Sequence, residues 1–181
     1  MARARPTVAA SLTALGLALV GSVSAGGGQS PAASHSFDPL YNAGERVDGL
    51  PLAAVLRRED TAEFVSFIYG DCVAGDDAGC APPAEIQIWP ACRRNLGLYD
   101  DATDSGAFAE PISLRGVPAI LFDDGTRLEL ETGRSTVVVF AGTRERVLRI
   151  AAGLRALDET VLPGLPLPKP VRKQGGDALE C

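Results

Sequence analysis

The sequence predicts an α+β fold: a mainly antiparallel sheet of five or six strands with one long C-terminal amphipathic helix packed on a face. Two observations support this prediction. Several short apolar runs rich in β-branched residues are separated by Gly, Pro and Asp, which is typical of antiparallel strands joined by turns. After the last of these runs, apolar residues recur at the spacing of an α-helix. We assign a single α+β domain to residues 41–158 of the 181-residue chain.

The first 25 residues have the layout of a secretory signal peptide. Arg3 and Arg5 precede an apolar run, and Val23 and Ala25 occupy the two small-residue positions of a cleavage site. We therefore expect a secreted or extracytoplasmic protein. The alternative is an uncleaved N-terminal anchor, because the apolar stretch is close to the shortest that spans a bilayer.

After this cleavage, both the new N-terminal segment and the C-terminal segment of the chain are predicted to lie outside the domain. Residues 26–40 are rich in Gly, Ser and Pro, which favours a flexible spacer. Residues 159–181 begin with four prolines in a short stretch, which favours extended chain, and this Pro-rich tail ends in Cys181.

The first half of the domain contains three predicted strands. Residues 50–58 form the first, with a short helix as the alternative. Residues 64–69 are aromatic and β-branched, which favours a buried strand. Residues 86–89 alternate apolar and polar side chains until Pro90, which ends the strand because it has no N–H to donate. The polar stretches between these strands and the next are predicted as loops: 71–83 and 93–113.

The second half opens with a predicted hairpin. The runs 117–122 and 127–131 flank Asp-Asp-Gly, and glycine takes the positive φ that a tight hairpin turn requires. The second run alternates leucines with charged residues, so we expect this hairpin to cover a core on one side only. The two sets are Leu128 and Leu130 against Arg127, Glu129 and Glu131.

A central strand and the helix complete the predicted domain. Residues 136–140 form the most apolar run, which we place in the middle of the sheet. Thr143 is a good N-cap, and Glu145 in the first turn suits the helix dipole. The predicted helix is 14 or 15 residues long. Its apolar face consists of Val147, Ile150, Ala151, Leu154 and Leu157.

Four cysteines are expected to form disulfides in an oxidising compartment. The favoured pairing joins Cys72 to Cys80 and Cys92 to Cys181, because the first pair closes a short loop in a turn region. By the chain-entropy argument, that first bridge stabilises the fold by roughly 2.5 kcal/mol. The alternative has one intramolecular bridge, 72–80 or 80–92, and leaves Cys181 for a partner chain. The spacing contains no C-x-x-C pair, which argues against zinc.

Part of the chain locally resembles the thioredoxin family. The run FVSFIYGDC leads to Cys72 and is followed by Cys80, and a Gly-x-Pro at 116–118 precedes a hairpin. The resemblance implies a thiol–disulfide redox protein that uses Cys72 and Cys80. The chain departs from the family pattern because seven residues, in place of two, separate the cysteines, and two prolines at 82–83 stand where a helix would begin.

Composition argues against several classes of function. The chain has 17 Lys and Arg against 23 Asp and Glu, a net charge of −6, which disfavours binding to nucleic acid or, once the signal peptide is removed, to a membrane. His35 is the only histidine and lies in the predicted spacer, so we expect no histidine-dependent nucleophile. We predict no catalytic residue, no bound metal and no cofactor.

The sequence therefore favours a non-catalytic binding or interaction protein of unknown ligand, with a protein or cell-envelope partner. Tyr69 and Trp89 come from the strands that flank the cysteine loop, and they are the candidate ligand surface, with core packing as the alternative. Two Asp-rich loops are predicted as solvated turns, with a weak Ca²⁺ site as the alternative. Their members are Asp71, Asp76 and Asp77 in one loop and Asp100, Asp101 and Asp104 in the other.

Overall fold

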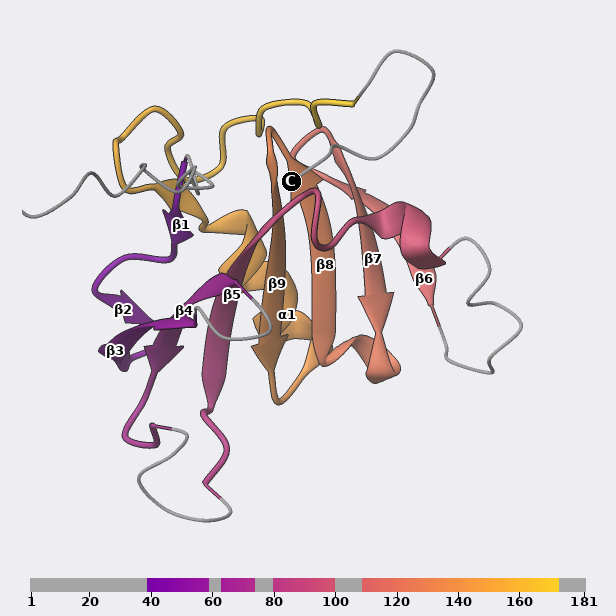
Figure 1. Ribbon diagram of the computed structural model, residues 1–181. Helices are drawn as coiled ribbons and strands as arrows, with labels where there is room; N and C mark the ends of the chain where they lie inside the picture. The colour runs from indigo at the N-terminus through magenta and orange to yellow at the C-terminus, as the bar shows by residue number, and fades with distance from the viewer. Residues whose placement is uncertain (1–38, 59–62, 74–79, 100–108, 173–181) are drawn as a thin grey trace, which may run out of the picture. The chain divides into compact units, whose positions relative to one another are not determined.

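The computed structural model describes residues 39–58, 63–73, 80–99 and 109–172, all of which belong to the unit Ser34–Cys181. These residues form a mostly β fold (Figure 1). It consists of an eight-stranded sheet, a two-stranded sheet and one α-helix of nine residues. The expectation of antiparallel pairing is confirmed. The α+β class, the strand number of five or six and the long C-terminal helix are wrong.

The first four strands of the large sheet form an antiparallel meander, which includes all three strands predicted in this half of the chain. Its members are β2 (Arg46–Val47), β3 (Leu50–Arg58), β4 (Phe64–Tyr69) and β5 (Ala84–Pro90). The extra strand, β2, has only two residues, so it carries no sequence pattern. Asp48 and Gly49 join it to β3 with positive φ at both residues, as a tight hairpin turn requires.

A second meander contributes the other four strands of the large sheet. Its members are β6 (Glu110–Leu114), β7 (Val117–Phe122), β8 (Arg127–Thr132) and β9 (Ser135–Ala141). β9 pairs with β5 over seven residues and so joins the two meanders, as its predicted central place requires. The hairpin turn is confirmed, since Asp123, Asp124 and Gly125 all have positive φ.

The predicted loop 93–113 contains regular structure that the sequence analysis missed. A 3-10 turn, η1, covers Leu96–Tyr99, and β6 begins at Glu110. β6 lies at the edge of the sheet, a position that tolerates Pro111 because one side of an edge strand has no partner to which N–H groups must donate. An edge strand with mostly exposed side chains lacks the apolar pattern by which buried strands are recognised.

The helix α1 (Arg144–Ala152) is shorter than predicted. Thr143 caps its N-terminus as expected, because the side chain accepts a hydrogen bond from the backbone N–H of Arg146. The helix ends at Gly153, a residue that disfavours helix interiors. Leu154 is still fully buried, but it precedes a strand, and Leu157 is 53% exposed. Helical spacing alone could not distinguish a buried leucine in the helix from one just beyond it.

The main core lies between α1 and one face of the large sheet, which we call the inner face. Val147 and Ile150 of α1 are fully buried against apolar side chains that alternate along the central strands. In Figure 1, α1 lies behind β8 and β9. The strand residues of this core include Phe67, Ile86, Ile88, Leu128, Leu130, Val137 and Val139.

The opposite, outer face is not solvent-facing as the hairpin pattern predicted. Glu129 is fully buried and Glu131 is 3% exposed. The turn after β5 brings Arg94 to the carboxylate of Glu129, and the backbone N–H of Leu96 donates to Glu131 at 2.6 Å. Arg172 also donates to Glu131. Buried carboxylates require such partners, and these partners lie far away in the sequence.

The Pro-rich segment is described over residues 159–172, and it packs on the domain from Val161 onward; we call residues 161–172 the C-terminal strap. Val161 and Leu167 belong to the main core. The N–H groups of Leu167 and Val171 donate to the carbonyls of Arg115 and Gly133, at 2.9 and 2.7 Å. Just before the strap, β10 (Arg155–Ala156) pairs with β1 (Tyr41–Asn42) in the small sheet.

Candidate functional site

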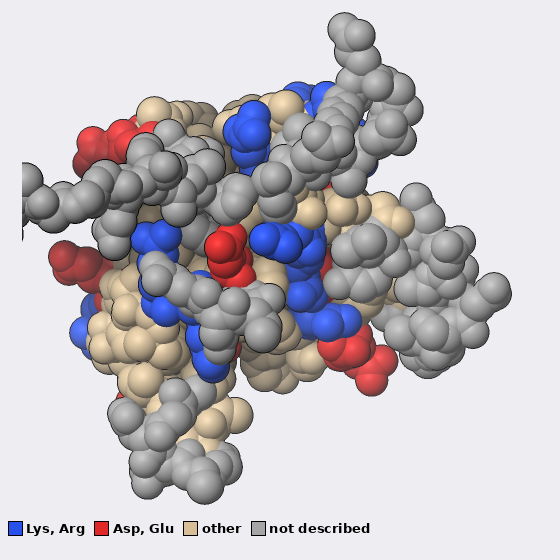
Figure 2. Space-filling model, viewed as in Figure 1, with Lys and Arg blue, Asp and Glu red and all other residues tan. Residues whose placement is uncertain are grey.

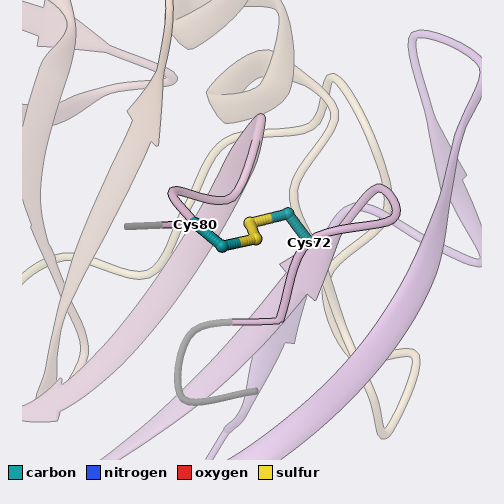
Figure 3. Close-up of a disulfide and its surroundings, with 2 residues drawn as sticks. All are labelled: Cys72 and Cys80. Carbon is teal, nitrogen blue, oxygen red and sulfur yellow. A yellow bond between two sulfur atoms is a disulfide. The ribbon is translucent and has the colours of Figure 1, made fainter. Parts of the chain in front are cut away.

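A disulfide joins Cys72 and Cys80, as predicted (Figure 3). The two half-buried residues lie between β4 and β5, with Cα atoms 5.9 Å apart. This bridge indicates an oxidising, extracytoplasmic environment. Cys92 is not a free thiol, and its predicted partner Cys181 lies outside the described residues. Among those residues, no helix has the length and apolar character needed to cross a membrane.

The surroundings of this disulfide differ from those that the thioredoxin resemblance implies. The chain after Cys80 enters strand β5, where the resemblance implies a long helix. α1, the α-helix of the described residues, begins only at Arg144, after β9. A helix N-terminus is one of the features that lower the pKa of a reactive thiol, and this cysteine pair lies instead between two hairpin strands.

The two aromatic residues predicted as a ligand surface lie on opposite faces of the sheet. Tyr69 is fully buried on the inner face, and its hydroxyl donates to the carbonyl of Gly44 and accepts from the N–H of Ala43, each at 3.0 Å. Burial raises the pKa of Tyr69 above its usual value of 10.0. Trp89 is half-buried on the outer face, stacked on Phe64 with ring centroids 4.4 Å apart. The structure does not bring the two together.

The other candidates from the sequence lie mostly outside the described residues. His35 does, and so do five of the six aspartates of the two loops: Asp76, Asp77, Asp100, Asp101 and Asp104. Asp71 is described and exposed. No cluster of three metal-ligating side chains occurs within the described ranges.

A continuous polar network crosses the outer face from β4 to β8. The side-chain amide of Gln87 donates to Glu85 at 2.9 Å, and Nε1 of Trp89 donates to the side-chain Oε1 of Gln87 at 3.0 Å. The guanidinium of Arg94 then lies 5.1 Å from the Trp89 ring centre and pairs with Glu129. Figure 2, viewed from this side, shows Lys and Arg side chains next to Asp and Glu over the sheet. These groups are bonded to one another, so the network serves the fold.

A cavity of about 290 Å³ lies beside the β7–β8 turn and is lined by Glu110 and Arg144, among others. The guanidinium of Arg144 donates two hydrogen bonds to the Glu110 carboxylate, at 2.5 and 2.8 Å. This pairing holds the pKa of Glu110 below its usual value of 4.5. Because the one guanidinium that lines the cavity is already paired with Glu110, and Asp124 adds a further carboxylate, it is a weaker candidate for ligand binding than the groove described next.

A larger groove of about 490 Å³ lies where the small sheet meets the chain after α1. Its apolar wall, which gives it the name leucine groove, consists of Leu52, Ala156, Leu157, Leu162 and Pro163. Its polar lining consists of Asn42, Gly44, Glu45, Arg155 and Glu159. This volume is typical of pockets that bind small ligands or peptide side chains.

The chain that carries the exposed leucines of the groove is fixed by hydrogen bonds. The guanidinium of Arg115 donates to three carbonyls at 2.5 to 2.7 Å, those of Leu154, Leu162 and Leu165. Asp158 accepts from the N–H and hydroxyl of Thr160, and these bonds lower the pKa of Asp158 below its usual value of 3.8. The exposed leucines are therefore held outward on an ordered frame.

The polar end of the groove contains donors without partners. Asn42 and Arg155 are cross-strand neighbours in the small sheet, so their side chains share a face. The Oδ1 atom of Asn42 accepts from the N–H of Gly44 at 2.8 Å, and its amide nitrogen has no partner among the described residues. Arg155 likewise forms no ion pair within them. A Cβ at Gly44 would lie 2.0 Å from the Arg155 guanidinium, so this glycine provides its space.

Sequence reasoning missed the leucine groove because its walls come from segments more than 100 residues apart in the chain, Leu52 on one side and Leu157 on the other. The available signal was Leu162, which lies in the Pro-rich segment outside any predicted amphipathic element. No protein-family model, no curated protein and no solved structure matches the chain. The candidate site is therefore argued from its geometry.

Proposed function

We propose that the protein is a non-catalytic, extracytoplasmic binding protein, exported by the signal peptide of residues 1–25. In this proposal it binds, in the leucine groove, an apolar peptide segment of a protein or cell-envelope partner. The observation that carries the proposal is the exposure of three leucines on a rigid frame. Leu157 and Leu162 line the groove and are 53% and 50% exposed, and Leu165, which follows in the strap outside the groove lining, is 52% exposed.

The rigidity of this frame favours a binding role over incidental exposure. Clustered exposed apolar side chains promote aggregation, and they are found at interaction sites. Here the backbone around them is held by the three hydrogen bonds from Arg115 and by the burial of Val161 and Leu167 in the core. A preorganised surface loses less conformational entropy on binding than a mobile one, which favours affinity.

Nuclear magnetic resonance with pooled peptides tests the proposal. The probe is a set of synthetic pentapeptides with free ends and apolar residues at two positions, added to ¹⁵N-labelled protein. We expect shifted amide resonances at Leu52, Ala156 and Leu157, and we expect these shifts to be lost in the double variant Leu157→Ser, Leu162→Ser. The matched control is Val55→Ser, since Val55 is also 53% exposed but lies outside the groove lining.

Two results would overturn the proposal. One is the absence of groove shifts with every peptide pool. The other is robust turnover in a panel of hydrolase and oxidoreductase substrates that a single Asp or Cys substitution abolishes.

A further inference from the structure

We infer that the leucine groove recognises the carboxylate end of an apolar peptide, with Arg155 and the Asn42 amide binding the carboxylate and the leucines binding the side chains next to it. This inference rests on the proposed function and names the ligand class of the same site.

The first step is the pair of unused donors. Asn42 is 7% exposed as a residue, and its amide nitrogen has no partner among the described residues; this nitrogen is not one of the fully buried unpartnered atoms, so it is open to solvent. Asn42 lines the groove, so a donor on it that is open to solvent and has no protein partner is available to an acceptor on a ligand. Arg155 stands directly across the strand pair, which places a second donor on the same face.

The second step is the position of these donors, which hydrogen bonds from the buried side chain of Tyr69 hold in place. The fully buried Tyr69 holds the Ala43–Gly44 turn by two hydrogen bonds, and Asn42 accepts from the N–H of Gly44. Gly44 has a φ of +91°, and its missing side chain leaves room for the guanidinium of Arg155. Tyr69, predicted as a ligand-surface residue, is thus a positioning residue in this inference.

The third step is charge. A planar guanidinium matches a carboxylate, and hydrogen bonds between ionised groups are stronger than neutral ones. The side chains of Glu45 and Glu159 also line the groove, and neither pairs with Arg155 or with any other described residue. They favour a basic residue in the ligand at a distance from its carboxylate. A peptide carries both charges, whereas a fatty acid carries only the carboxylate.

The test compares a peptide acid with its amide by fluorescence anisotropy. The probe is a fluorescein-labelled pentapeptide, Gly-Lys-Gly-Leu-Leu, with a free carboxylate, and its twin ends in a carboxamide. On wild-type protein, we expect amidation of the peptide to weaken binding by about tenfold. The amide loses one charge-assisted hydrogen bond, the one between the peptide carboxylate and the guanidinium of Arg155. Decanoate, added as a competitor, is expected to displace the peptide weakly, because it has no positive charge to pair with Glu45 and Glu159.

Variants of Arg155 and a matched arginine complete the test. Arg155→Gln should bind acid and amide equally, while Arg46→Gln should keep the preference, because Arg46 is exposed and lies outside the groove lining. Equal binding of acid and amide to the wild type would overturn the inference and leave the proposed function standing. Failure of both labelled peptides would also overturn it, and the proposed function fails only if the pooled pentapeptides fail as well. Displacement by decanoate that exceeds binding of the peptide acid would assign the site to a fatty acid and overturn the peptide assignment.

Discussion

Arg94 lies against Glu129, a carboxylate that is fully buried on the outer face of the sheet, with Nε 2.8 Å from Oε2. Arg127 stands further away, with its Nε 3.8 Å from the other carboxylate oxygen. Arg94 comes from the turn after β5, so this contact fastens the chain between the two meanders to the centre of β8. A buried carboxylate is tolerated only while it is paired and hydrogen-bonded.

Replacing Arg94 should therefore destabilise the fold strongly. Arg94→Met removes a guanidinium that is hydrogen-bonded to the buried carboxylate of Glu129, and Arg127 lies further from it, so we expect the free energy of unfolding to fall by about 2–3 kcal/mol. Urea denaturation followed by circular dichroism measures this change. Arg93→Met is the matched control, because the neighbouring Arg93 is exposed, and it should change stability little. Equal effects of the two variants would contradict the importance of the buried pair.

Arg115 should hold the C-terminal strap in place. It adopts a positive φ of 51° and donates to three carbonyls, so Arg115→Gly relieves the backbone strain but removes all three hydrogen bonds. We expect a net loss of about 1–3 kcal/mol in stability. Faster hydrogen exchange at the Leu167 and Val171 amides would locate that loss in the strap. The control Lys169→Met, which removes one exposed hydrogen bond from the same segment, should have a much smaller effect on stability. If Arg115→Gly were instead more stable than the wild type, the backbone strain at Arg115 would outweigh its three hydrogen bonds.

Local signals in the sequence predicted much of this fold, and long-range contacts account for what they missed. The β4 pattern, the Asp-Asp-Gly turn and the Thr143 cap are properties of neighbouring residues, and all three are confirmed. The burial of Glu129 depends on Arg94, 35 residues away, and no alternation of apolar and charged residues contains that information. A strand with polar side chains on one face looks solvent-facing until its distant partners are known.

The candidate site was hidden for a related reason. Leu154 and Leu157 fit the period of a helix, so both were assigned to its buried face. The chain instead ends its helix at Gly153, buries Leu154 and turns Leu157 outward beside β1, whose partner strand β10 begins at Arg155. The groove thus lies where the helix predicted from apolar periodicity does not continue. Residues after Gly153 are no longer helical, so they can pair with strand β1 near the N-terminal end of the domain.

Asp48 should make stability depend on pH in the acid range. It lies between two arginines of α1, with Oδ2 2.8 Å from Arg149 and 3.2 Å from Arg146, and the bond to Arg149 contributes most to holding the pKa of Asp48 below its usual value of 3.8. A lowered carboxyl pKa contributes stability that is complete above the unfolded-state pKa and is lost as the pH falls through the folded-state value.

Asp48→Asn tests this dependence, because asparagine also tolerates the positive φ of 48° at this position. We expect the variant to have a lower melting temperature than the wild type at pH 7, and we expect the difference to disappear as the pH falls below about 3.8. Melting curves across that range, followed by circular dichroism, measure it. A difference that stays constant with pH would show that the charge of Asp48 is not responsible.

The Cys72–Cys80 bridge should behave as a structural crosslink. Backbone pairing of β4 with β5 extends to Tyr69 and Ala84, which keeps the two cysteines close together even when they are reduced. The double variant Cys72→Ala, Cys80→Ala should lose roughly 2.5 kcal/mol, because the bridge closes a short loop in the unfolded chain. In wild-type protein, reduced glutathione under native conditions should leave the bridge intact until the fold melts, as alkylation and mass spectrometry would show. Ready reduction of the folded protein, together with reduction of insulin disulfides by the dithiol form, would favour instead the redox role implied by the local thioredoxin resemblance.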